Sequence, residues 1–74
     1  MFKDRLRSTR IEQHYTQQQI ADAIGVTLRS YQRYESGRIE PPYQTLLALA
    51  NFLNVSLDYL FCRDDFISSL ENKA

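Results

Sequence analysis

Apolar residues recur along this chain at intervals of three and four, a spacing that predicts short helices and not strands. The first helix is expected over Phe2–Gln13, where Phe2 and Leu6 lie one turn apart on the same side. His14 follows at the point where a helix-ending glycine is usual, and histidine tolerates the left-handed backbone better than most residues.

A second helix is expected to begin at Thr16 because "TQQQ" forms a capping box. The Thr16 hydroxyl can accept from the amide of Gln19, whose side chain can reach back to Thr16. The apolar stripe of this helix is Ile20, Ala21 and Ile24. Gly25 suits the left-handed position at its end. Thr16 and Gln17 place polar donors at the helix N-terminus, whose free N–H groups favour a phosphate.

A third helix is predicted from Thr27, a capping residue, to about Glu35. A turn of two residues, one of them Gly25, separates it from the preceding helix. Two helices joined by so short a glycine-containing turn indicate a helix-turn-helix over about residues 16–36.

Two more helices are predicted over about Pro42–Leu53 and Leu57–Phe61, with proline suited to the first turn of the former. The apolar stripe of the longer one consists of Leu46, Leu49, Ala50 and Leu53. The expected fold is therefore all-α: a five-helix domain with a helix-turn-helix over residues 1–63, followed by a tail over residues 64–74.

The third helix has two chemically different sides when its residues are placed 100° apart. The outward side holds Leu28, Arg29, Gln32 and Arg33. The opposite side holds Tyr31, Tyr34 and Glu35. Arginine presents a donor fork that fits guanine, glutamine fits adenine, and the methyl groups of Thr27 or Leu28 can contact thymine. The alternative for such a face is a solvated surface without a partner.

Composition describes an ordinary globular domain with 43% hydrophobic residues and no apolar run long enough for a membrane helix. The charged N-terminus is unlike a signal peptide, and the single cysteine, Cys62, fits a reducing cytoplasm. Cys62 and His14 are too few for a metal site, so no metal and no cofactor are expected.

The net charge is zero, from nine basic and nine acidic residues, but the charges are unevenly distributed. Residues 1–38 carry seven basic and four acidic residues, a net +3, and residues 39–74 carry two and five, a net −3. One basic half suggests that one face meets an anion, although such a split also arises by chance in a short chain.

Two segments, "TQQQIADAIGVTLRSYQRYESG" and "PPYQTLLALANFLNVSLDYLF", resemble the lambda-repressor-like, Cro-type helix-turn-helix DNA-binding domains of the xenobiotic-response-element family. The resemblance covers about Phe2 to Phe61. It implies a phosphate contact by Gln17 and an ion pair between Arg10 and Glu35. The positions that match the major-groove residues are Thr27, Leu28, Arg29, Gln32 and Arg33. The positions that match further backbone contacts are Ser36, Arg38 and Tyr43.

The chain departs from the family pattern at Glu40 and Pro41, where many relatives are basic, and at His14, which replaces a glycine. Zero net charge also predicts weak non-specific affinity for DNA and a shallow dependence on salt.

The function expected from these residues is sequence-specific binding of a duplex DNA operator by a small transcriptional regulator, a repressor in the first instance. The alternative is a protein-interaction module such as an antitoxin or anti-repressor. An enzyme is not expected, because no catalytic triad, metal set or phosphate loop is recognisable. A homodimer through the fifth helix and the tail is also expected. Its candidate contacts are Leu47, Phe52, Tyr59, Phe61, Phe66, Ile67 and Leu70. Each could instead belong to the core, an alternative that is at least as strong for Phe61 and Leu70.

Overall fold

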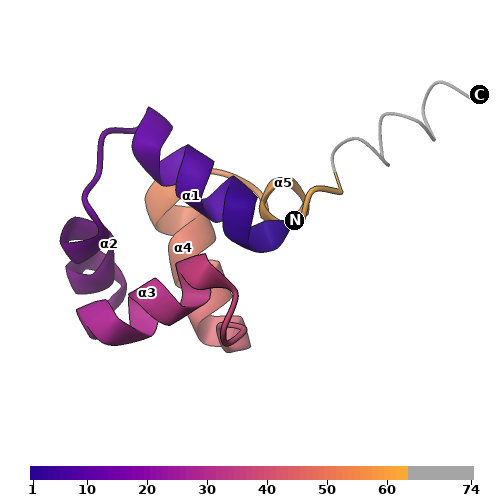
Figure 1. Cartoon of the computed structure of the whole chain (residues 1–74). Coiled ribbons are helices and arrows are strands. Elements are labelled where there is room, and N and C mark those ends of the chain that lie inside the picture. The colour runs from indigo at the N-terminus through magenta and orange to yellow at the C-terminus, as the bar shows by residue number, and fades with distance from the viewer. Residues whose placement is uncertain (64–74) are drawn as a thin grey trace, which may run out of the picture.

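The computed structural model describes residues 1–63, and these fold into five helices with no strand among them (Figure 1). The helices are α1 (Phe2–Glu12), α2 (Gln17–Ile24), α3 (Leu28–Ser36), α4 (Tyr43–Leu53) and α5 (Leu57–Leu60). The all-α fold predicted from the hydrophobic spacing is therefore confirmed. The tail residues predicted to have helical spacing, Phe66, Ile67 and Leu70, lie outside the described residues.

Side-chain caps begin three of the helices, as their sequences predict. The Thr16 hydroxyl accepts from the Gln19 amide at 3.0 Å, and the Gln19 side chain accepts from the Thr16 amide at 2.8 Å, which completes the capping box. Thr27 caps α3 and Ser56 caps α5 in the same manner. Gly25 ends α2 at a φ of 77°, a conformation in which a side chain would be strained.

Several helix ends differ by a residue from the prediction. The first helix ends at Glu12, although His14 does adopt the expected left-handed conformation, at a φ of 64°. Pro42 is the N-cap of α4 and not part of its first turn, because its ψ of 160° is extended. α5 stops before Phe61, and Cys62 then turns the chain through a φ of 61°, which the sequence did not indicate.

The core is formed where α2 packs on α3 and α4, while α1 packs on α3 and α5. Its fully or almost fully buried side chains are Leu6, Ile20, Ala21, Tyr31, Tyr34, Leu49, Ala50, Leu53 and Leu60. This arrangement places α2 and α3 together on one side of the domain, away from α5 and the N-terminus (Figure 1). α3 can therefore bury one side in the core and keep its other side free.

The described residues that were candidates for a dimer contact fall into two groups. Phe52 and Tyr59 are half-buried, Phe52 against the ring of Tyr15 and Tyr59 beneath the guanidinium of Arg5. Leu47 and Phe61 are exposed, so the alternative that Phe61 belongs to the core is wrong. No helix within residues 1–63 is both long and apolar enough to cross a membrane.

Candidate nucleic-acid interface

The two sides of α3 differ as the helical wheel predicts. Its core side holds Tyr31, Tyr34 and Glu35, all three buried. Arg29 and Gln32 are exposed on the other side, where Leu28 and Arg33 are half-buried. At the start of the helix, the exposed Thr27 uses its hydroxyl to accept from the Ser30 amide at 3.1 Å. The five residues predicted to contact bases thus lie on or beside the free side of one helix.

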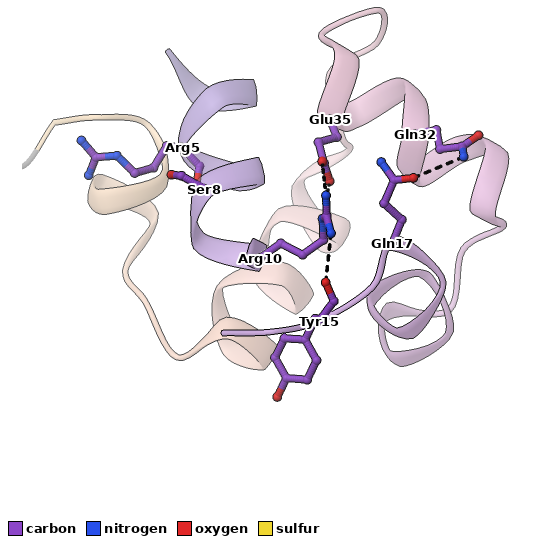
Figure 2. Close-up of polar contacts among 7 residues, drawn as sticks. All are labelled: Arg5, Ser8, Arg10, Tyr15, Gln17, Gln32 and Glu35. Atoms are coloured by element: carbon purple, nitrogen blue, oxygen red, sulfur yellow. Dashed lines mark hydrogen bonds and ion pairs between the residues drawn. The ribbon is translucent and has the colours of Figure 1, made fainter. Parts of the chain in front are cut away.

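A buried ion pair attaches α3 to α1 (Figure 2). Arg10 donates from Nε to one oxygen of Glu35 at 2.9 Å and from Nη2 to the other at 2.8 Å. Its third nitrogen, Nη1, donates to the carbonyl of Tyr15 at 2.9 Å. Because Tyr15 directly precedes Thr16, the N-cap of α2, the single Arg10 guanidinium ties the start of α2 to α3. Arg10, on α1, therefore holds the two helices of the helix-turn-helix in their relative position.

The protonation of this pair is fixed by its surroundings. Burial alone would raise the pKa of Glu35, but the hydrogen bonds and positive charge of Arg10 outweigh it, so the pKa lies below the ordinary value of 4.5. The hydrogen bond to Glu35 likewise raises the pKa of Arg10. Burial raises the pKa of the neighbouring Tyr31, whose hydroxyl is enclosed without a hydrogen bond of ordinary geometry in the described residues. The pair is therefore fully ionised at neutral pH.

A second contact links the two helices on the outer side. The Gln32 amide donates to the side-chain oxygen of Gln17 at 3.3 Å, across 15 residues of sequence (Figure 2). One residue was predicted to contact a base and the other a phosphate, but their contact with each other was not predicted. The only sequence signal for it is that Gln17 begins one helix and Gln32 lies on the outward side of the next.

The arginines of the described region separate by their partners. Arg10 is paired with Glu35, Arg5 lies over the ring of Tyr59 with 4.3 Å from its Cζ to the ring centroid, and Arg63 lies 3.5 Å from Asp58. Within residues 1–63, no side-chain hydrogen bond or ion pair engages Arg7, Arg29, Arg33 or Arg38. Cations without an internal partner remain available for an external anion.

Two surface hollows gather several of the predicted residues. One is lined by Arg7, Arg10, Gln17, Gln32, Glu35 and Ser36. The other, lined by Arg33, Arg38 and Ile39, joins the end of α3 to the following loop. Tyr43 is 68% exposed at the start of α4 and lines neither hollow. Thr16 is exposed at the start of α2, beside Gln17.

The potential metal ligands within residues 1–63 are not grouped into a metal site. No group of three or more histidine, cysteine or acidic side chains within residues 1–63 could hold a metal ion. The exposed His14 and the half-buried Cys62 belong to no such group.

Comparison with known proteins identifies the family. The family model described as "Helix-turn-helix" matches residues 6–60, so the chain belongs to the helix-turn-helix family. The resemblance to the Cro-type domains is thereby confirmed. No solved structure gives a significant match.

Two similar bacterial proteins carry names that refer to transcription. The chain is 47% identical over 60 residues to the "Uncharacterized HTH-type transcriptional regulator YqaE" of Bacillus subtilis (strain 168), which covers 81% of this chain and 52% of that protein. It is 43% identical over 58 residues to the "Cryptic phage CTXphi transcriptional repressor RstR" of Vibrio cholerae serotype O1 (strain ATCC 39315 / El Tor Inaba N16961), which covers 78% and 52%.

A more distant relative carries the opposite regulatory name. The chain is 26% identical over 72 residues to the "HTH-type transcriptional activator BcrR" of Enterococcus faecalis, which covers 97% of this chain and 35% of that protein. This chain therefore spans about half the length, or less, of these three relatives.

Proposed function

We propose that this chain binds duplex DNA in a sequence-specific manner as a transcriptional regulator, with α3 in the major groove. The observation that supports this most is the free side of α3: Arg29, Gln32 and Arg33 lie together on it, and neither arginine has a partner within residues 1–63. A helix that is only solvated would not need the buried Arg10–Glu35 ion pair, which holds the opposite side of α3 against α1.

The two arginines offer the donor geometry that guanine requires. Each guanidinium presents parallel N–H groups that can bind guanine O6 and N7 together, and a good pair of this kind contributes roughly 1–3 kcal/mol of discrimination against the wrong base. Thr27 and Leu28 lie at the start of α3, where a methyl group can contact thymine. Recognition by fit suits a chain whose net charge is zero.

Gln32 is oriented by its contact with Gln17. After donating one hydrogen to Gln17, the Gln32 amide keeps its oxygen and its second hydrogen, which are the groups that adenine N6 and N7 need. The Gln17 amide also donates toward Glu35, which helps to lower the pKa of that carboxyl, and its remaining hydrogen can donate to a phosphate. The pair would thus couple one base contact to one backbone contact.

Backbone phosphates are proposed to lie on both sides of the recognition helix. On one side, Thr16 and Gln17 begin α2, whose first N–H groups lack intrahelical acceptors and favour an anion. On the other side, Arg38 and Tyr43 follow the end of α3 and are exposed. Ser36, the last residue of α3, is also exposed and lines the same hollow as Gln17. Contacts of this kind position the helix but carry no sequence information.

The regulator is proposed to be a repressor, because occupying a promoter needs no further activity and a relative is named as a repressor. Its proposed location is the cytoplasm. A homodimer would place two α3 helices one DNA turn apart, on half-sites about 34 Å apart. Exposed Phe61 after α5 and exposed Leu47 on α4 are the described residues proposed to contribute to its contact. A monomer in sedimentation experiments at high micromolar concentration would contradict the dimer.

The proposed function is tested by selecting bound duplexes from a random pool and then measuring Arg29→Ala and Arg33→Ala on the selected operator. Each variant should lose preference for the operator over an unrelated duplex, by about tenfold or more, while its unfolding midpoint stays unchanged. If both variants prefer the operator as strongly as the original chain, α3 does not read the bases.

A protein-interaction module remains the second candidate, supported by one apolar hollow lined by Met1, Phe2, Glu40, Pro41, Leu46 and Phe61. Phe61 is 45% exposed here and stacks on Phe2 with ring centroids 5.2 Å apart. This function predicts that the random pool yields no enriched sequence and that Phe61→Ser, but not Arg33→Ala, abolishes activity.

A further inference from the structure

The hollow beside the Gln17–Gln32 contact has a wall that belongs to neither helix of the helix-turn-helix. Arg7, one turn before Arg10 on α1, lines it together with Gln17 and Ser36. Its side chain is exposed and has no hydrogen bond or ion pair within the described region. α1 therefore brings an unpaired cation next to residues already proposed to lie at the DNA.

The net charge of the side chains that line this hollow comes from Arg7. Its other two charges, Arg10 and Glu35, are joined by two hydrogen bonds, and their side chains are only 14% and 5% exposed. They neutralise each other and have no free charge to offer an anion. Arg7 is thus the uncompensated positive charge in the hollow, whose lining also includes Gln17.

The basic side of α1 also continues along the end of α3. Lys3 lies one turn before Arg7, and its side chain packs over Gly37, so closely that a Cβ at Gly37 would be 2.7 Å from the Lys3 Cδ. α1 packs on α3, and Arg7 lines the hollow together with Ser36, the last residue of α3.

We propose that the hollow between α1, the start of α2 and the end of α3 holds one phosphodiester group of the duplex backbone, with Arg7 as its cation and Gln17 as its amide donor. This inference rests on the proposed DNA binding and adds α1 to the contact surface. Because a phosphate contact carries no sequence information, Arg7 should increase affinity without changing preference.

The test compares Arg7→Gln with Arg63→Gln, which removes the same charge from the end of the domain beyond α5. Binding to the selected operator and to an unrelated duplex is measured over a series of salt concentrations. Arg7→Gln should weaken both by the same factor and reduce the slope of log K against log salt by about 0.9, the value for one phosphate contact. Arg63→Gln should leave the slope unchanged.

A second measurement locates the phosphate itself. Operators with a neutral methylphosphonate at one backbone position at a time are bound by the original chain and by Arg7→Gln. One position in each half-site should weaken binding by the original chain and have no further effect on Arg7→Gln, because the contact is already lost. Arg7→Lys should recover the salt slope, since it restores the charge.

The outcomes separate this inference from the function on which it rests. If the original chain binds no duplex selectively, both are wrong. If it binds its operator, yet Arg7→Gln has the salt slope of Arg63→Gln and remains sensitive to every methylphosphonate, only the Arg7 site is wrong. Unchanged unfolding midpoints for both variants ensure that a change in slope reflects binding.

Discussion

Arg10 and Arg33 are the same side chain in opposite circumstances. Arg10 uses all three guanidinium nitrogens inside the protein, on Glu35 and the Tyr15 carbonyl. Arg33, 23 positions later, has no side-chain partner within residues 1–63 and lies at the free side of α3. The fold thus uses one arginine to hold α3 in place and leaves another without an internal partner, so the partners of a charge distinguish the two arginines better than net charge does.

The largest effect should come from breaking the internal pair. Glu35→Gln leaves the Arg10 charge buried without a counter-ion, and losing one partner of such a pair costs roughly 3–5 kcal/mol of unfolding free energy. Urea unfolding at neutral pH measures it. Glu12→Gln removes an exposed carboxylate that has no side-chain partner in the described helices, and it should change stability by less than about 0.5 kcal/mol. Equal losses in the two variants would contradict the role of the pair.

The same pair predicts how stability depends on pH. The pKa of Glu35 is lower in the folded state than its ordinary value of 4.5, so its contribution is present above that value and lost as the pH falls through the folded pKa. Arg10 does not titrate in this range. Urea midpoints measured from pH 6 downward should therefore fall less steeply for Glu35→Gln than for Glu12→Gln. Parallel curves would show that another carboxylate dominates acid unfolding.

A smaller effect is expected from the contact between Gln17 and Gln32. Gln17→Ala should weaken binding to all duplexes, whereas Gln32→Ala should reduce the preference at one base pair. The double variant should lose less operator affinity than the sum of the two, with a coupling of about 1 kcal/mol, because each supports the other's contact. Strict additivity in titrations of the three variants would mean that the hydrogen bond contributes nothing in the complex.

The smallest effect is predicted for an arginine paired at the surface. Arg63 and Asp58 are each more than half exposed and 3.5 Å apart, a geometry that typically contributes less than 1 kcal/mol. Arg63→Gln should therefore leave both thermal unfolding and operator affinity nearly unchanged. A loss as large as that of Glu35→Gln would show that exposure does not distinguish the two pairs.

Local chemistry made much of the fold predictable. The capping box at Thr16, the turn at Gly25 and the left-handed His14 each depend on interactions within a few residues. The inward side of α3 was predictable in the same way, because Tyr31, Tyr34 and Glu35 have the spacing of one helix face. The family resemblance supplied the partner of Glu35, which spacing alone would not have identified.

Contacts between distant segments were not predictable in this way. The Gln13 side chain donates to the carbonyl of Leu53 at 2.7 Å, across 40 residues, and Arg5 donates to the carbonyl of Tyr59 across 54. Neither leaves a periodic signal, because each depends on how whole helices pack. The position of Arg7 beside Gln17 has the same origin: it follows from the approach of α1 to the end of α3.

The most direct test of the proposed base-reading face of α3 keeps the charge of its arginines and removes the planar guanidinium. Arg29→Lys and Arg33→Lys retain one positive charge each but lose the planar fork, so they are put through selection from a random duplex pool beside the original chain. Each variant should retain the salt dependence and the unfolding midpoint and lose preference at one base pair of each half-site. Selected sequences identical to those of the original chain would contradict base reading by α3.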